Sequence, residues 1–127
     1  MPVVKVHIAS KQAEYLLATL PPSIRQAMAQ AYRIPESDVR VLISQYGAGC
    51  LDGDDNEFLF IEVLAIEGRS KQAKKDLYRR MVDNVSEVAG ISPKAVLIML
   101  HELSQDNCGV RGGHMASEID LGFTVAV

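Results

Sequence analysis

The second residue of the chain is the first candidate for chemistry. Pro2 follows Met1, and because small second residues generally permit removal of the initiator methionine, the prolyl nitrogen can become a free secondary amine. Such an amine is basic and nucleophilic, unlike an amide nitrogen. Burial among apolar side chains and nearby arginines lowers its pKa toward neutrality, where a general base works best. Pro2 is therefore a candidate general base; if Met1 is retained, it is an ordinary residue at the start of a strand.

The stretch after Pro2 has the pattern of a strand that would hold this nitrogen at the edge of a core. Val4, Val6 and Ile8 are apolar and alternate with polar residues. Alternation with a period of two is typical of a strand with one buried face. We therefore expect Pro2 to be anchored rigidly where this strand begins.

Composition narrows the classes of function. The chain has 127 residues, of which 48% are hydrophobic and 23% charged, as in one folded domain with a sizeable core. Its net charge of −3 argues against a nucleic-acid partner. No apolar run reaches the length of a membrane span and no signal peptide is evident, so we expect a cytoplasmic protein without a membrane partner.

Residues that ligate metals or form disulfides are sparse. The chain has two cysteines, Cys50 and Cys108, and three histidines, His7, His101 and His114. Their spacing fits neither a disulfide framework nor a zinc site. The acidic residues between 52 and 57 lack the spacing of a calcium loop. We expect reduced thiols, no metal and no cofactor.

The chain aligns with itself at an offset of 57 positions. This offset pairs Ile34 with Ile91 and Val39 with Val96. It predicts one domain made of two copies of a strand-helix-strand unit, about residues 1–57 and 58–127. A strand-to-strand step through a helix should be a right-handed parallel crossover. The expected fold is α+β, with tandem β-α-β units that form a four-stranded sheet with two helices on one face.

The two copies differ in the kind of helix that the sequence predicts. In the second copy, Ser70 suits an N-cap and Gly90 suits the end of an amphipathic helix. In the first copy, Pro21-Pro22 interrupts the pattern, since an internal proline removes a hydrogen bond and clashes with the preceding turn. We therefore expect a short helix over Lys11 to Thr19, then a break or kink, and a second segment that begins near Pro22.

The expected layers leave one sheet face without cover. Two helices can cover only one face, so the other should be buried by oligomerisation. The apolar tail Ile119–Val127 is a candidate strand for a neighbouring subunit.

Several motifs resemble a known family. They are Pro2 at the start, Ile34-Pro35 and Val39-Arg40-Val41 in the first copy, and Ile66-Glu67-Gly68-Arg69-Ser70, Cys108–Gly113 and Ala116-Ser117 in the second. They resemble the tautomerase superfamily, whose members use an amino-terminal proline on a β-α-β unit. The chain looks like a fused, tandem 4-oxalocrotonate tautomerase. That resemblance implies a homotrimer, as is usual for long members of the superfamily.

The resemblance also implies the roles of single residues. Pro2 would be the general base in keto-enol proton transfer on a small 2-oxo or 2-hydroxy carboxylic acid. Arg40 and Arg69 would bind the carboxylate or carbonyl through paired hydrogen bonds. Taken singly, Arg69 is also compatible with an ion pair to Glu67 or Glu62, and Arg40 with a surface position on a strand. Only one complete set of these groups exists per chain.

Further pocket positions and other activities follow from the same comparison. The resemblance places Asp38, Leu51 and Cys108 at the pocket, with Cys108 where a large aromatic residue is usual. Asp38 is similar to an aspartate of malonate semialdehyde decarboxylase. That enzyme's pair of arginines is here Glu67-Gly68-Arg69, and its tryptophan is absent. A decarboxylase-like or dehalogenase- or hydratase-like enzyme is therefore one alternative, and a catalytically degenerate ligand-binding homo-oligomer is another.

Overall fold

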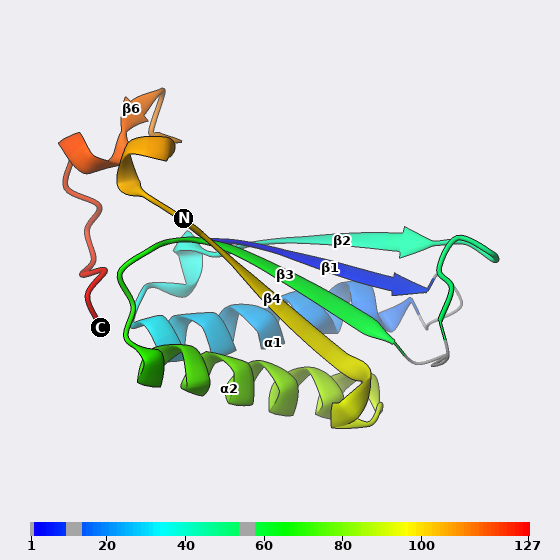
Figure 1. Ribbon diagram of the computed structural model, residues 1–127. Helices are drawn as coiled ribbons and strands as arrows, with labels where there is room; N and C mark the ends of the chain where they lie inside the picture. The colour runs from blue at the N-terminus through cyan, green and yellow to red at the C-terminus, as the bar shows by residue number, and fades with distance from the viewer. Residues whose placement is uncertain (1, 10–13, 54–57) are drawn as a thin grey trace.

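The computed structural model describes residues 2–9, 14–53 and 58–127 (Figure 1). The main elements, in chain order, are β1 (Val3–Ala9), α1 (Tyr15–Tyr32), β2 (Arg40–Tyr46), β3 (Leu59–Ile66), α2 (Lys71–Ala89) and β4 (Val96–Leu103). A small hairpin of β5 (Gly109–Val110) and β6 (His114–Met115) follows. Strand, helix and strand thus occur twice in succession.

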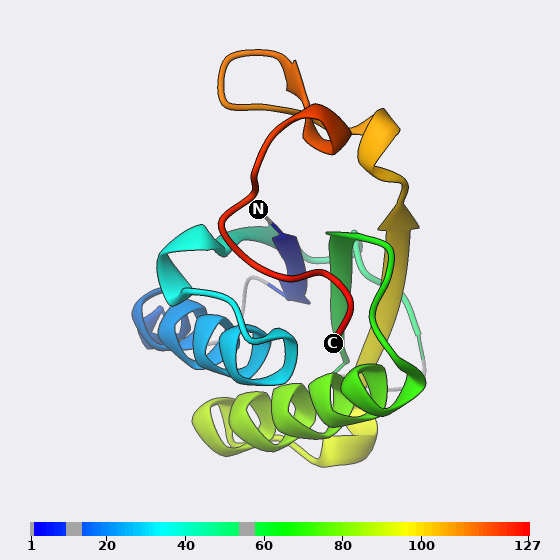
Figure 2. The same ribbon diagram turned by 90° about the vertical axis from the view of Figure 1, so that its left-hand side faces the viewer.

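The four long strands form one mixed sheet in the order β2-β1-β3-β4. β1 is parallel to β2 and β3 is parallel to β4, while β1 and β3 pair antiparallel at the centre. Both helices lie on the same face of the sheet (Figures 1 and 2). The predicted fold, tandem β-α-β units with two helices on one face of a four-stranded sheet, is confirmed.

The core lies between the sheet and the two helices. Alternate residues of the central strands point into it, as the period of two predicts. The fully buried side chains include Val4, Val6, Ile61 and Val63 from the sheet, Leu20, Ile24 and Met28 from α1, and Leu77, Met81 and Val85 from α2. This packing fixes the ends of β1 and β3, which are the ends that position Pro2 and Arg69.

The break predicted at Pro21-Pro22 is wrong, because α1 continues through both prolines from Tyr15 to Tyr32. Each internal proline costs about 3 kcal/mol. The helix buries Leu16, Leu20, Ile24, Met28 and other apolar residues, at about 1.5–3 kcal/mol for each large side chain. Leu17 and Ala18, whose carbonyls lose their donors, are exposed and can be solvated. Burial of the apolar stripe therefore outweighs the lost hydrogen bonds. Residues 11–13 of the predicted first segment lie outside the described part of the chain.

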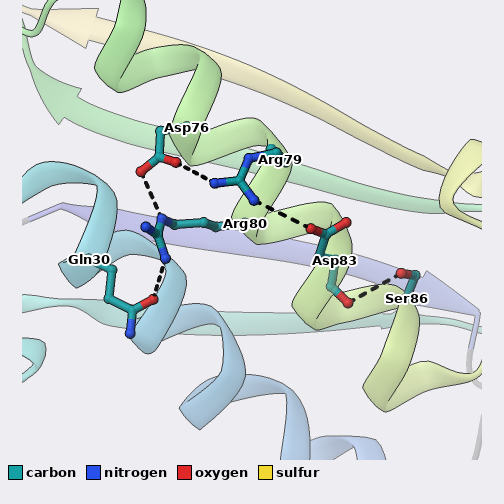
Figure 3. Close-up of polar contacts among 6 residues, drawn as sticks. All are labelled: Gln30, Asp76, Arg79, Arg80, Asp83 and Ser86. Atoms are coloured by element: carbon teal, nitrogen blue, oxygen red, sulfur yellow. Dashed lines mark hydrogen bonds and ion pairs between the residues drawn. The ribbon is translucent and has the colours of Figure 1, made fainter.

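Helix α2 has the predicted ends and a charged outer face. The Ser70 side chain accepts a hydrogen bond from the Ala73 amide, and Gly90 ends the helix with φ of 66°. On the outer face, Asp76 accepts hydrogen bonds from Arg79 and Arg80, at 2.7 Å each (Figure 3). Arg79 and Arg80 of this helix are therefore paired with a carboxylate on a solvated face.

The second sheet face is not covered by any element of the described residues. Leu42, Leu97 and Met99 point from the outer strands on this side and are 52%, 42% and 50% exposed. At its centre Glu62 lies 2.7 Å from His7 Nε2 and 3.2 Å from His101 Nε2. We call this surface the open sheet face; it carries apolar side chains around a polar centre.

The C-terminal segment, residues 119–127, folds back over the chain that carries it (Figure 2). The Ser70 hydroxyl donates to the Val127 carbonyl at 2.9 Å, and Leu121 is buried. No strand forms within this segment. The role as a strand of a neighbouring subunit stays a prediction, since the structure holds one chain.

Candidate active site

Six residues that are widely separated in the sequence line one cavity. They are Pro2, Tyr32, Ala65, Ile66, Arg69 and Phe123. Counting the part open to solvent, its empty volume is about 220 Å³. Pro2 is buried, and its carbonyl accepts a hydrogen bond from the Arg40 amide at 3.1 Å. Pairing of β1 with two strands thus holds Pro2 at the cavity.

Arg69 enters the cavity from the turn between β3 and α2. Its guanidinium carbon lies 4.5 Å from the centre of the Tyr32 ring and 5.6 Å from that of Phe123. Its Nη1 donates to the Ile66 carbonyl at 3.1 Å. The turn before it depends on Gly68, whose φ of 127° is unfavourable for other residues. The Arg69 guanidinium therefore contacts the faces of two aromatic rings.

Arg69 is an unusual buried cation. It is 8% exposed, and within the described part of the chain no carboxylate forms an ion pair with it. Its Nε atom is buried without a hydrogen-bond partner in that part. Burial lowers the pKa of Arg69, yet a guanidinium remains charged at neutral pH. The cation thus has unused donors that suit the oxygens of a small carboxylate.

Neither Glu67 nor Glu62, the two partners considered for Arg69 from the sequence, forms an ion pair with it among the described residues. Glu62 lies on the other side of the sheet. That carboxylate faces the open sheet face, where the hydrogen bond with His7 lowers its pKa. Alternation along β3 explains the difference, since Glu62 and the buried residues of this strand point to opposite faces.

The sequence did not reveal Tyr32 or Phe123 as residues of this cavity, and Tyr32 is the one that carries a polar group. It is 1% exposed, and its hydroxyl has no hydrogen-bond partner among the described residues. Burial raises the pKa of Tyr32 to about 12, against the lowering effect of the Arg69 charge. The available signal was its position four residues after Met28, on the apolar stripe of a helix.

The other predicted site residues do not line the cavity, and Leu51 lies at the end of the sheet opposite to Pro2, because β1 and β2 run parallel. Arg40 is exposed, and its Nη1 donates to the Ser37 carbonyl at 2.7 Å, in a separate hollow with Arg25. Asp38 lies in the turn before β2. Leu51 lies in the loop after β2. Within one chain, the structure brings together Pro2 and Arg69 but not Arg40.

Cys108 lies behind one wall of the cavity. It is half-buried and packs against the buried cluster of Ile66, Ala116 and Leu121, of which Ile66 lines the cavity. Its Sγ donates to the Ser104 carbonyl at 3.6 Å. Phe123 thus supplies an aromatic wall that the cysteine itself cannot.

The described residues contain neither a cluster of metal ligands nor a membrane-spanning helix. In residues 2–9, 14–53 and 58–127, no group of three or more His, Cys, Asp or Glu side chains is placed to hold a metal ion. Over the same ranges, neither helix is both long and apolar enough to cross a membrane. The acidic residues 54–57 of the loop lie outside this description.

The fold and the cavity define a class of protein that sequence comparison identifies. Residues 40–111 match the model of a family described as tautomerase enzymes. This match spans more than half of the chain, so the chain belongs to this family of enzymes. It is 29% identical over 108 residues to the probable tautomerase YusQ of Bacillus subtilis, which covers 79% of this chain and 85% of that protein.

Solved structures share the whole architecture. Pt0534 inactivated by 2-oxo-3-pentynoate is similar with a TM-score of 0.86 and 22% identity, over 91% of this chain and 97% of that one. A fused 4-OT that forms a symmetric trimer has a TM-score of 0.83 and 23% identity, over 91% and 96% of the two chains. The fused 4-OT fold predicted from the sequence is therefore confirmed.

Proposed function

We propose that the chain catalyses keto-enol tautomerisation of a small 2-oxo or 2-hydroxy carboxylic acid. Removal of Met1 would leave Pro2 as a free amine and general base. The observation that supports this proposal is that Pro2 and Arg69, far apart in sequence, line the same small cavity. Proton transfer on an organic acid requires a base and a cation that binds the acid. Pro2 is the potential base, and Arg69 is a cation without an ion pair among the described residues.

The proposed reaction divides the work between two groups. Arg69 binds the substrate carboxylate through two hydrogen bonds and holds the adjacent carbon near Pro2. The Pro2 amine removes a proton and returns it to the other position, from carbon to oxygen or the reverse. The apolar side chains of Ala65, Ile66 and Phe123 exclude water and disfavour the protonated amine, which lowers its pKa.

We propose a homotrimer as the active assembly. The open sheet face exposes large apolar side chains that a second copy would bury. A fused 4-OT of the same architecture is a symmetric trimer. Arg40 lies on the edge strand β2, where an adjoining subunit could bring its guanidinium to a site. Arg40 thus remains the proposed second substrate-binding residue, and size-exclusion chromatography with light scattering tests the assembly.

The decarboxylase- or hydratase-like alternative needs a role for Asp38. That residue does not line the cavity with Pro2 and Arg69 in the described chain. Tautomerisation needs only the groups that do line it, so it is the better-supported function. The predicted cytoplasmic location stays a prediction.

Intact mass spectrometry and amine labelling test the proposal. The purified protein should lack one methionine, and a halopropiolate-type alkylator should modify Pro2 and abolish ketonisation of the enol form of phenylpyruvate. Retention of Met1, or inactivation with the label on Cys50 or Cys108 and not on Pro2, would contradict it.

A further inference from the structure

The cavity holds a buried phenol to which the function proposed above gives no part. Tyr32 is 1% exposed and its hydroxyl is unpartnered within the described residues. Burying a hydroxyl without a hydrogen bond costs stability, and native proteins rarely keep such a group without a reason. An oxygen that arrives with a ligand would supply the missing partner.

The position of the ring limits where the hydroxyl can act. Its face is covered by the Arg69 guanidinium at 4.5 Å, and Tyr32 lines the cavity together with Pro2. The ring is packed on the core side of α1, so the hydroxyl cannot turn to bulk water. The Tyr32 ring and the Arg69 guanidinium therefore border one small space, and each carries a buried donor without a partner among the described residues.

We propose that Tyr32 is a catalytic residue whose hydroxyl donates a hydrogen bond to the carbonyl oxygen of a 2-oxo acid held by Arg69. This inference rests on the proposed function. When Pro2 takes the proton from the carbon beside the carbonyl, the C–H electron pair forms the new double bond and the carbonyl π electrons move to oxygen. Tyr32 keeps its own proton and stabilises that negative charge. Protonated Pro2 then delivers its proton to the oxygen, which gives the enol.

The electrostatics of the cavity suit this role. Burial raises the pKa of Tyr32 to about 12, so the phenol is a neutral donor throughout the physiological range. A donor that is fixed in a dry site before charge develops costs no reorganisation, and removing one typically lowers kcat by about 10²–10³-fold. Contact between Tyr32 and Arg69 favours substrates whose oxygen lies on the carbon next to the carboxylate.

The test is Tyr32→Phe in the assembled, methionine-processed enzyme, with the enol of phenylpyruvate as substrate. The variant keeps the ring that stacks on Arg69 and removes one oxygen. We expect kcat to fall by about 100-fold while KM stays within about threefold. Inhibition by hydrocinnamate, which carries a carboxylate but no adjacent oxygen, should be unchanged. The matched control is Tyr15→Phe, at the exposed start of the same helix, which should behave as wild type.

Thermal unfolding supplies a second readout. Loss of an unpartnered buried hydroxyl should raise Tm by about 2 °C or more. A kcat within threefold of wild type, or a fall in Tm, would overturn the role of Tyr32. If Arg69→Met and blocking of the Pro2 amine still abolish activity in that case, the proposed function stands; if neither does, the proposed function fails as well.

Discussion

Replacing Arg69 separates substrate binding from folding more cleanly than any other change in the cavity. One N–H of its guanidinium is used by the Ile66 carbonyl, and its Nε is buried without a partner in the described chain. Arginine has five N–H donors, so enough remain for a two-point contact with a carboxylate. Arg69→Met would remove these donors and retain an apolar side chain of similar length.

The expected loss follows from those contacts. Hydrogen bonds to a charged group contribute about 1.5–3 kcal/mol each, so two of them contribute about 3–6 kcal/mol. Arg69→Met should therefore lower kcat/KM by about 10²–10⁴-fold. Arg69→Lys keeps the charge but offers one bond in place of two, and should lower it by about 10- to 100-fold. Because the lysine charge still attracts the carboxylate, kcat/KM of Arg69→Lys should lie between the values of the wild type and of Arg69→Met.

Stability should hardly change in Arg69→Met. The variant loses two cation–ring contacts, with Tyr32 and Phe123, which stabilise by about 0.5–2 kcal/mol. It also removes a buried cation with no described ion pair, a change that is often neutral or stabilising. These effects oppose each other, so we expect Tm to stay within about 3 °C of wild type.

The assay is ketonisation of the phenylpyruvate enol, followed by its ultraviolet absorbance, with Tm measured on the same samples. Arg79→Met is the matched control, since that side chain is 62% exposed and binds only the surface residues Asp76 and Asp83. It should retain wild-type kcat/KM, because exposed ion pairs contribute little. Wild-type kcat/KM in Arg69→Met would refute the assignment of this guanidinium to the substrate.

Three further predictions concern the cavity phenol, the turn before Arg69 and the open sheet face. As pH rises from 10 to 12, the wild-type free energy of unfolding should fall, because the unfolded phenol of Tyr32 releases its proton before the folded one; urea titrations should show a shallower fall in Tyr32→Phe. Gly68→Ala should destabilise by about 2–4 kcal/mol in calorimetry, since φ is 127° and the new Cβ would lie 2.7 Å from Val125; unchanged Tm would contradict this. Met99→Asp should dissociate the proposed trimer in light scattering, because it sets a charge on the exposed apolar surface that a second copy would bury; an intact trimer would show that this face is not the interface.

Most of the fold could be predicted from the sequence because local and tertiary signals agree. The alternation in β1 and the caps at Ser70 and Gly90 each fix an element by themselves. The left-handed residues that end the two helices, Arg33 and Gly90, are 57 positions apart, the same offset as in the sequence alignment of the chain with itself. The internal duplication itself stays a prediction.

The errors arise where long-range packing outweighs a local rule. Pro21-Pro22 breaks an isolated helix, but here the apolar stripe of α1 is buried against the sheet and α2. In the C-terminal segment, Val125 packs against the turn before α2, a contact that no local pattern shows; its role in a neighbouring subunit stays a prediction. Tertiary contacts that decide such cases are not encoded in the nearest few residues.

The same limit applies to the site. Pro2 and Arg69 were recognisable because their chemistry and surrounding motifs are distinctive. Tyr32 and Phe123 belong to apolar patterns that also describe ordinary core residues, and only the closure of the C-terminal segment over Arg69 brings them to one cavity. The parts of Arg40, Asp38, Leu51 and Cys108 in catalysis remain predictions, since a second subunit would change what surrounds them.

The meeting of Pro2 and Phe123 at one cavity has a practical consequence for preparing the enzyme. Under the proposed mechanism, an affinity tag fused ahead of Pro2 would convert its nitrogen into an amide and leave a folded but inactive protein. A tag placed after Val127 would adjoin the carbonyl that Ser70 holds, and would burden the segment that carries Phe123. Untagged protein, or a tag cleaved so that proline comes first, is therefore the material in which low activity can be interpreted.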